Sequence, residues 1–403
     1  MAKIDDSVKK KVPELRFPGF TDDWEERKLS DIVVRLTKSS NNNQLPKVEF
    51  EDIIAGEGRL NKDISRKFDD RKGTLFEPDN ILYGKLRPYL KNWLFSDFKG
   101  IALGDFWVFK SKNSEPKFVY SLIQADNYQR VANDTSGTKM PRSDWKKVSS
   151  SNFSIPTSLE EQQKIGSFFK QLDNTIALHQ RKLDLLKLQK KAFLQKMFPK
   201  NGSKIPELRF EGFADDWEER KLGTIYDFGK GKGLPLDSFI YSSNNPAIAY
   251  GHLYTKYSEV ISEVFWSSND NGVLSKDNDL LFPGSSTVPN GTAQANAITL
   301  NNVKLGGDII IGRPKEGVGV LSTFMSYQVN SQRQKLFPIT VGTTITHMYG
   351  KDISKLNFFI TDYSEQEKIA SFFKQLDDTI ALHQRKLDLL KEQKKGFLQK
   401  MFV

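Results

Sequence analysis

Residues 161–198 read EQQKIGSFFKQLDNTIALHQRKLDLLKLQKKAFLQKMF, and residues 365–402 read EQEKIASFFKQLDDTIALHQRKLDLLKEQKKGFLQKMF. The two copies agree at 33 of 38 positions. Neither copy contains proline, and in both copies mostly apolar residues recur at alternating steps of four and three, which is typical of a heptad seam. The sequence therefore predicts two long helices that pack through this seam.

The predicted seam occupies the same positions in both copies. In the first copy it consists of Ile165, Phe169, Leu172, Ile176, His179, Leu183, Leu186, Phe193 and Met197, with Lys190 at one further position. In the second copy it consists of Ile369, Phe373, Leu376, Ile380, His383, Leu387, Leu390, Phe397 and Met401. A lone seam histidine is more often a packed polar residue than a metal ligand, so no metal site is predicted.

A second phrase is also written twice. Residues 15–29 read LRFPGFTDDWEERKL and residues 208–222 read LRFEGFADDWEERKL, with 13 of 15 positions the same. Between these entrances and the helices lie two bodies, residues 30–160 and 223–364, that show almost no similarity to each other. A repeated frame around dissimilar bodies favours a scaffold that presents exchangeable modules, although a tandem duplication with one drifting copy is an alternative.

Connectivity predicts the direction of the helices. The first helix carries the chain from the first body to the second entrance, so a pseudo-two-fold relation requires the second helix to run back, antiparallel to the first. Within the bodies, the stretches at 79–90 and 100–112 predict strands with loops and the stretch at 116–134 predicts a helix. Trp24 and Trp217 are expected to anchor the cores. The predicted class is α+β, with two mixed domains separated by two long antiparallel helices.

Composition limits the classes of function. The chain has 60 Lys and Arg against 50 Asp and Glu, a formal charge of +10, which favours an anionic partner such as nucleic acid. Cysteine is absent, which excludes disulfides, thiolate metal sites and cysteine nucleophiles. The N-terminal sequence lacks the apolar core of a signal peptide, and no apolar run is long enough to span a membrane. We therefore expect a soluble cytoplasmic protein.

Several phrases together resemble the specificity subunits of type I restriction-modification enzymes. They are the two entrances, the stretch YGKLRPYL at 83–90, a Gly-Thr turn late in each body at 137–138 and 342–343, and the E-Q-x-K-I starts of the helices. The resemblance implies a non-catalytic subunit that reads double-stranded DNA. It also implies two modification (methyltransferase) subunits and restriction subunits as partners. S-adenosylmethionine, ATP and magnesium are then expected on those partners, with no cofactor bound by this chain.

The resemblance predicts the following organisation: an N-terminal tail over 1–11, target recognition domain 1 over 12–160, spacer helix 1 over 161–198, a linker over 199–204, target recognition domain 2 over 205–364 and spacer helix 2 over 365–403. Because the two bodies differ, the target is expected to be asymmetric and bipartite, with one half-site for each domain and an unread gap between them.

Candidate DNA contacts lie in loops that combine cations, aromatic rings and small polar side chains. In the first body they are Lys85, Arg87, Tyr89, Lys91, Ser136, Thr138, Lys139 and Arg142. In the second body they are Ser285, Ser286, Thr287, Arg313, Thr343, Thr344, Thr346 and His347, with Lys351 nearby. Core aromatics, solvated lysines and ligand-free turns remain the alternative reading of these stretches. Since the first body has 21 cations and 17 anions and the second has 11 of each, more phosphate contacts are expected in the first.

Two other functions were weighed against DNA recognition. A methyltransferase requires an Asn/Asp-Pro-Pro-aromatic motif, but NNPAIAY at 244–250 has a single proline, and FGKGKG at 228–233 lacks the spacing of a phosphate-binding loop. A nuclease requires clustered carboxylates, and none is apparent. The second alternative is a coiled-coil adaptor whose two variable domains bind proteins. Leu178, Leu185, Leu382 and Leu389 lie off the seam, where they either dock partner helices or widen the contact between the two helices.

Overall fold

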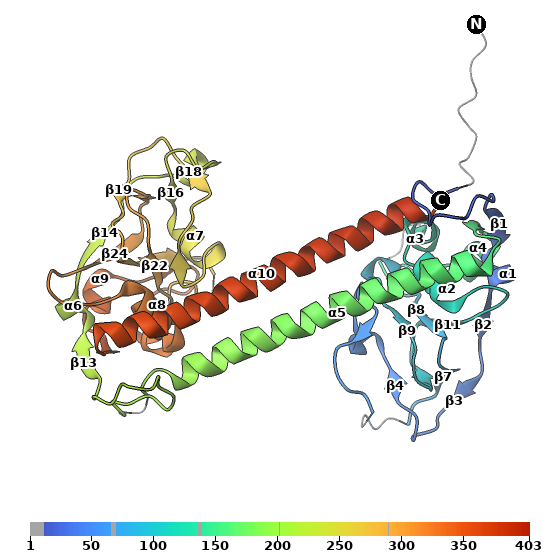
Figure 1. Ribbon diagram of the computed structural model, residues 1–403, viewed down its shortest axis with the longest axis horizontal. Helices are drawn as coiled ribbons and strands as arrows, with labels where there is room; N and C mark the ends of the chain where they lie inside the picture. The colour runs from blue at the N-terminus through green and yellow to red at the C-terminus, as the bar shows by residue number, and fades with distance from the viewer. Residues whose placement is uncertain (1–11, 66–69, 136–138, 201, 289) are drawn as a thin grey trace, which may run out of the picture. The chain divides into compact units, whose positions relative to one another are not determined.

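The computed structural model describes residues 12–65, 70–135, 139–200, 202–288 and 290–403. The chain forms two compact units, which we call unit 1 (Met1–Arg181 and Gln384–Val403) and unit 2 (Lys182–His383). Two long helices, α5 (Leu159–Lys196) and α10 (Tyr363–Met401), each begin in one unit and end in the other (Figure 1). The predicted α+β class with two long helices is confirmed.

Within each unit the segments of α5 and α10 run antiparallel. In unit 1, Phe168 of α5 packs edge-on against Phe397 of α10 with ring centroids 5.0 Å apart, and in unit 2 the equivalent rings of Phe372 and Phe193 lie 5.1 Å apart. Each residue is 204 positions from its equivalent, so the same contact is made twice with the two helices exchanged. The predicted antiparallel pairing and the pseudo-two-fold repeat are therefore confirmed.

Unit 1 contains two four-stranded sheets. The first has the order β2-β11-β8-β9 and is antiparallel throughout, with strands Val33–Leu36, Phe106–Ser111, Ile81–Gly84 and Trp93–Phe95. The second has the order β3-β7-β10-β4, with strands Ser39–Ser40, Gly73–Phe76, Gly100–Ala102 and Lys47–Val48. Strand β8 is apolar at nearly every position and entirely buried, so it forms the centre of the unit 1 core.

Helices pack against the first sheet of unit 1. They are α1 (Leu29–Ile32), α2 (Pro116–Leu122), α3 (Asp126–Asn133) and α4 (Trp145–Ser150). The Glu115 side chain accepts a hydrogen bond from the Phe118 N–H and so caps α2, with proline at its first position. The single helix predicted over 116–134 is wrong, because Ala125 is extended (φ −70°, ψ 153°) and divides it into α2 and α3.

Unit 2 repeats this plan with a larger sheet. Its five-stranded sheet has the order β14-β24-β20-β22-β17, with strands Tyr226–Lys230, Ile309–Pro314, Asp279–Pro283, Asn296–Ile298 and Val260–Ile261. A three-stranded sheet has the order β16-β23-β19, with strands Ala247–Ile248, Lys304–Leu305 and Val273–Leu274. The accompanying helices are α6 (Leu222–Ile225), α7 (Tyr250–Thr255), α8 (Ser322–Ser331) and α9 (Gly350–Ile353). Helix α8, like α2 in unit 1, follows the longest strand of its body and is mostly buried.

The repeated entrances hold each body to the start of a long helix. Arg16 binds Glu161 through two hydrogen bonds of 2.6 and 2.8 Å, and Arg209 binds Glu365 with the same two distances. After each arginine a short strand, β1 (Glu25–Lys28) or β13 (Glu218–Lys221), pairs antiparallel with the last strand of its body, β12 (Asn152–Ile155) or β26 (Asn357–Ile360). Trp24 and Trp217 are both buried, as predicted for core anchors.

The end of α10 completes the core of unit 1. Met401 and Phe402 are buried in the same apolar cluster as Trp24. The Phe402 ring stacks on Phe118 at 5.6 Å, and the Leu15 N–H donates to the Lys400 carbonyl at 2.9 Å. Unit 1 is therefore built from two segments of the chain that are far apart in sequence.

Candidate nucleic-acid interface

Two loops of unit 1 pair with each other at the end of strand β8. The Arg87 N–H donates to the Pro141 carbonyl at 2.7 Å, and the Ser143 N–H donates to the Lys85 carbonyl at 2.8 Å. Arg87 holds this position with φ 47°, a left-handed conformation that is uncommon outside glycine. The structure thus brings the YGKLRPYL loop and the loop before α4 together, and we call this pair platform 1 (residues 85–91 and 139–143).

Platform 1 exposes most of the candidate side chains that the sequence singled out. Arg87, Lys91, Lys139 and Arg142 are exposed, and Tyr89 is 55% exposed. Ser136 and Thr138 lie outside the described residues. Two other aromatic residues near this loop, Tyr83 and Trp93, are buried in the core. For these two, the alternative of core packing in place of DNA contact holds. Burial raises the pKa of Tyr83 to about 12, consistent with a role in packing.

A carboxylate lies beside platform 1. Arg142 Nη2 lies 3.0 Å from one oxygen of Asp105, and Lys85 Nζ lies 3.6 Å from the other. The Lys85 N–H also donates to the Asp105 carbonyl at 2.9 Å. The hydrogen bond from Arg142 is the main cause that holds the pKa of Asp105 below its ordinary value. Asp105 therefore remains ionised and orients two cations of the platform.

Unit 2 has an equivalent pair of loops, which we call platform 2 (residues 284–288 and 341–349). Short strands β21 (Ser285–Ser286) and β25 (Thr346–His347) pair antiparallel there, and the Met348 N–H donates to the Gly284 carbonyl at 2.9 Å. The carboxylate of Asp308 corresponds to that of Asp105. It binds Lys230 at 2.7 Å and accepts from the Ser285 hydroxyl at 2.9 Å. The hydrogen bond from Lys230 is the first cause of the lowered pKa of Asp308.

The candidate residues of the second body fall into two groups. Thr287, Thr343 and Thr344 are exposed on platform 2, and Thr346 and His347 are half-buried there. Ser285 and Ser286 are buried, since their strand is covered by β25. Arg313 lies away from the platform on β24, where it binds the buried Asp279 through hydrogen bonds of 2.9 and 3.0 Å. Its guanidinium is therefore committed to an internal ion pair.

The two aspartates are the site residues that sequence reasoning missed. Each follows glycine in the turn before the longest strand of its body, as LGD at 103–105 and GGD at 306–308. The recurrence of Gly-Asp between two apolar strands in otherwise dissimilar bodies was a signal that could have identified them. Both turns use positive φ, at Gly104 (80°) and at Asp308 (60°), so the dipeptide also has a backbone role.

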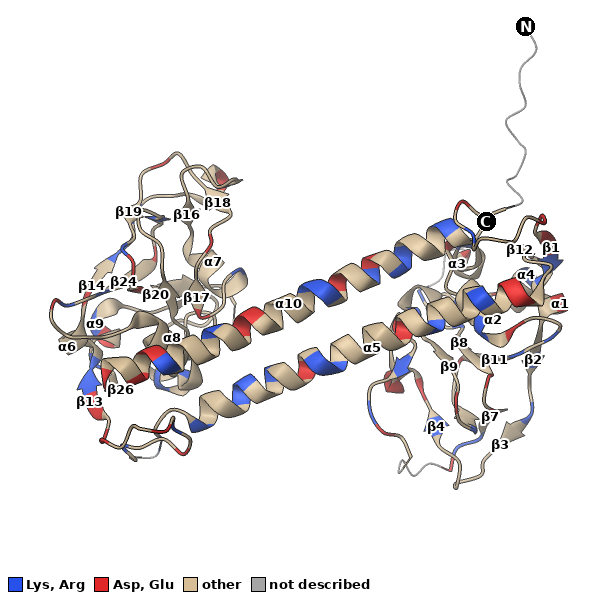
Figure 2. Ribbon diagram, viewed as in Figure 1, with Lys and Arg blue, Asp and Glu red and all other residues tan. Residues whose placement is uncertain are grey.

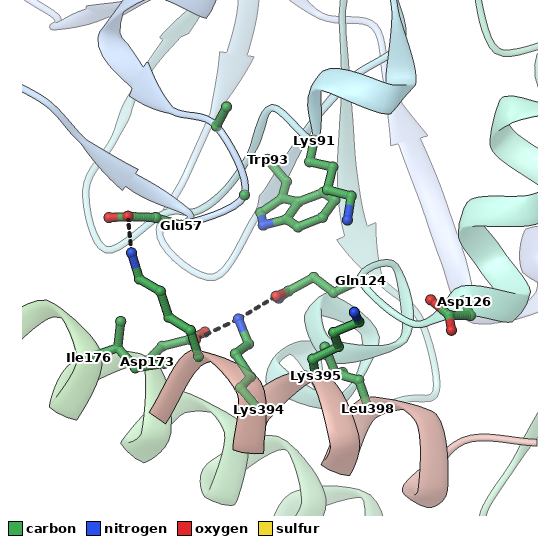
Figure 3. A pocket seen from close by; sticks show the side chains of 13 residues that line it. Glu57, Lys91, Trp93, Gln124, Asp126, Asp173, Ile176, Lys394, Lys395 and Leu398 are labelled. Carbon is green, nitrogen blue, oxygen red and sulfur yellow. Dashed lines mark hydrogen bonds and ion pairs between the residues drawn. The ribbon is translucent and has the colours of Figure 1, made fainter. Parts of the chain in front are cut away.

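One lysine of each repeat attaches the long helices to the adjacent body. In unit 1, Lys394 Nζ lies 2.6 Å from Asp173 of α5 and 2.7 Å from the Gln124 side-chain oxygen, at the edge of a hollow also lined by Trp93 (Figure 3). A second ion pair, Lys391 with Glu57 at 2.9 Å, borders the same hollow (Figure 3). These polar contacts hold body and helices together.

The outer faces of the long helices carry exposed leucines among charges of both signs (Figure 2). The predicted seam residues are buried or half-buried, including the two histidines. Leu178, Leu185, Leu382 and Leu389 are between 47% and 66% exposed, so they do not widen the helix contact. Leu188, which glutamate replaces in the second copy, is 63% exposed, as expected for an outward position.

The described residues contain neither a metal site nor a helix that could span a membrane. Among them, no group of three or more His, Asp or Glu side chains lies close enough together to hold a metal ion. None of the described helices is both long and apolar enough to cross a membrane.

Comparison with known proteins identifies the family. The model of the type I restriction modification DNA specificity domain matches residues 21–188 and again residues 214–392. The chain belongs to this family of specificity subunits. The two matches each cover the second half of an entrance, a body and much of a long helix, so the family unit corresponds to the repeated unit of this chain. Membership implies recognition of a DNA sequence, the role for which the two platforms were singled out.

Relatives in the family share this organisation. The chain is 22% identical over 334 residues to the specificity subunit of the type I restriction enzyme MjaVIII from Methanocaldococcus jannaschii, covering 76% of this chain and 74% of the relative. The fold resembles the crystal structure of a type I S subunit from M. genitalium, with a TM-score of 0.66, 12% identity and coverage of 97% and 99%. A chain from a study of assembly of a type I system gives a TM-score of 0.52 at 17% identity, with coverage of 93% and 96%.

Proposed function

We propose that this chain reads an asymmetric, bipartite DNA target, with one half-site for each unit, as the non-catalytic subunit of a type I restriction-modification system. In the proposal, platform 1 and platform 2 each contact one half-site. The modification subunits bring S-adenosylmethionine, and the restriction subunits bring ATP and magnesium. This chain then binds no cofactor itself and works in the cytoplasm, where the DNA is.

One observation carries the proposal. Platform 1 and platform 2 have the same backbone plan, with a loop after the central strand, a second loop paired to it and an aspartate beside them, yet their exposed side chains differ. Platform 1 presents Arg87, Tyr89 and Arg142, whereas platform 2 has no arginine or lysine and exposes Thr287, Thr343 and Thr344 beside apolar side chains and the ring of Tyr349. Arginine suits hydrogen bonds to guanine in the major groove, while threonine contacts several bases. A common plan with different side chains is what two different half-sites require.

The exposed leucines of the long helices support the proposal of partner subunits. Leu178 and Leu382 occupy equivalent positions of the two copies and are 66% and 60% exposed. Because pseudo-equivalent apolar side chains would offer the same contact twice, they suit two copies of one partner. Replacing both by glutamate should abolish co-purification of the modification subunits and leave the fold intact, as measured by circular dichroism. Unchanged co-purification would contradict this role.

The proposed target is tested by mapping methylated positions across a genome. The chain is expressed with its modification subunits, first unchanged and then with residues 30–160 replaced by the same region of a related subunit. A bipartite motif should appear, and the replacement should change one half only. Insertion of one heptad into both long helices adds about 10 Å and should lengthen the unread gap by about three base pairs. A motif whose gap stays the same would contradict a spacing role for the helices.

Salt dependence separates DNA recognition from the protein-adaptor alternative. A chain that contacts several phosphates should lose about one logarithmic unit of affinity per contact for each tenfold rise in salt. An adaptor for proteins should show no affinity for a duplex at any salt concentration. The measurement uses the chain assembled with its modification subunits. A chain that binds DNA only together with these partners is then not mistaken for one that does not bind DNA.

A further inference from the structure

We infer that the edge strand β14 and its continuation, residues 228–234, form a second DNA-contacting surface in unit 2 that binds the sugar-phosphate backbone. This inference rests on the proposed function and extends it. The segment reads FGKGKGL, which lacks the spacing of a phosphate-binding loop. The structure gives it a different setting, in which a strand edge, a glycine without an internal role and several lysines coincide.

Strand β14 lies at the edge of the five-stranded sheet. It pairs with β24 on one side, and no described strand pairs with its other side. Three hollows in the protein surface adjoin this segment, and all three are lined by Lys230. An edge strand presents backbone N–H groups that are not used within the sheet. The N–H groups of Gly231 and Lys232 already donate to the carbonyls of Ile309 and Leu305, so the groups left for an anion are those of β14 that point away from β24.

Gly229 is the observation that points to a ligand. It does not have a positive φ, and a Cβ atom added to it would meet nothing within 4 Å. The fold requires glycine at the two neighbouring positions. A Cβ on Gly231 would lie 2.0 Å from the Gly306 carbonyl oxygen, and Gly233 has φ 64°. Glycine weakens a strand interior relative to a residue with a side chain. Glycine at position 229 leaves the backbone of β14 open to the close approach of a phosphate, which a side chain at this position would hinder.

The charges of this surface favour a polyanion. Lys232 is exposed and has no ion-pair partner among the described residues. Lys230 is 66% exposed and keeps most of its surface in solvent although it binds Asp308. Lys351, from α9, lines the hollow that also contains Lys230, and its ammonium lies 5.8 Å from the ring centre of Tyr349. Lys230, Lys232 and Lys351 thus border a surface whose hollows contain two carboxylates, those of Asp308 and Asp227.

The surface is continuous with platform 2. The hollow that contains Lys230 and Lys351 is also lined by Gly284, His347 and Met348 of the platform. A duplex that contacts the threonines of platform 2 would therefore place a strand of its backbone over β14. Net charge predicts fewer phosphate contacts in the second body than in the first, but the clustering of cations on one surface decides binding more than the total charge does.

The test compares variants of the full chain assembled with its modification subunits. Fluorescence anisotropy measures affinity for a duplex that carries the mapped target and for a scrambled duplex, at several salt concentrations. Lys232→Gln and Lys351→Gln should each reduce the slope of log affinity against log salt by about 0.9. The loss should be equal on both duplexes, because phosphate contacts carry no sequence information. Lys276→Gln is the matched control, since Lys276 is exposed and lines none of the three hollows.

A graded series at Gly229 tests the close approach. Gly229→Ala and Gly229→Val should leave the thermal stability of the chain unchanged or slightly raised, because the added Cβ atom meets nothing within 4 Å and valine favours a strand. Both should weaken DNA binding, valine more than alanine. If wild-type protein binds the duplex while these variants bind equally well with unchanged salt slopes, this inference is overturned and the proposed function stands. If the wild-type assembly itself ignores DNA, both are overturned.

Discussion

Replacing Lys190 by methionine should destabilise unit 2 more than the equivalent change at Lys394 destabilises unit 1. The two lysines occupy the same position of the repeat and are buried alike, with side chains 14% and 11% exposed. Lys190 binds two carboxylates, Glu259 at 2.7 Å and Asp377 at 2.6 Å. Lys394 binds one carboxylate, Asp173, and a neutral amide. The comparison therefore varies the number of buried charges that lose their partner.

The magnitude follows from these contacts. Removing one partner of a buried ion pair costs about 3–5 kcal/mol, since the remaining charge is left without compensation. Two carboxylates about 5 Å apart repel by about 3 kcal/mol at an effective dielectric constant of about 20. We expect the free energy of unfolding to fall by about 3 kcal/mol for Lys394→Met and by about 5 kcal/mol for Lys190→Met, because solvent screens part of the repulsion.

The difference should depend on pH. Burial raises the pKa of Asp377 above its ordinary value even though Lys190 opposes the shift. Without Lys190, burial and the charge of Glu259 raise the pKa of Asp377 further against the hydrogen bond from Tyr327, so Asp377 binds a proton more tightly in the folded variant than in the unfolded chain. A carboxyl group with a raised folded-state pKa gives stability that increases as pH falls and is lost as pH rises through that pKa. The excess cost of Lys190→Met should therefore shrink between pH 8 and pH 5.

Hydrogen exchange measured by mass spectrometry provides the assay, because it reports each unit separately. Protection of β20 and β24 reports on unit 2, and protection of β8 and β11 reports on unit 1. Equal losses of protection for the two substitutions at pH 8 would refute the argument from the number of carboxylates that lose their partner. An excess that persists unchanged at pH 5 would refute the electrostatic cause.

Two further predictions concern the repeated frame. Gly396→Ala should raise the free energy of unfolding by up to about 1 kcal/mol. The reason is that an added Cβ meets nothing within 4 Å and that the equivalent residue in the first copy is Ala192. Urea denaturation measures this change, and a lower free energy of unfolding would contradict the prediction. Arg209→Lys should cost about 1–2 kcal/mol, because lysine keeps the charge but not both hydrogen bonds to Glu365. Arg16→Lys should lower the free energy of unfolding by the same amount in the same measurement. Unequal losses would contradict the equivalence of the two entrances.

The sequence predicted the frame of this molecule well because the frame obeys local rules. The heptad spacing identified both long helices, and duplication identified their antiparallel pairing. Trp24 and Trp217 were recognisable as core residues from their place in the repeated entrance. The heptad pattern lies within about 40 residues of continuous sequence, and the duplication is visible from a direct comparison of the two copies.

The order of the strands in the bodies could not be predicted in the same way. Many strands there are two residues long, which is too short for a periodic pattern, and the pairing of distant loops decides what is exposed. Ser285 and Ser286 have the composition of a binding loop, yet β25 covers them. Arg313 has the chemistry of a base contact, yet Asp279 binds it. The DNA-contacting role of the candidate loops stays a prediction, and the exposure of their individual side chains depends on long-range contacts.

The burial of Met401 and Phe402 in the unit 1 core has a consequence for synthesis on the ribosome. Unit 2 is one continuous stretch, so it can fold once residue 383 has left the exit tunnel. Unit 1 needs the segment from residue 384 onward and must wait with an incomplete core, although its first residues emerge earliest. The body made first is thus finished last. A released chain truncated after residue 383 should show unit 1 cleaved by protease while unit 2 resists, and equal resistance of both would contradict this order.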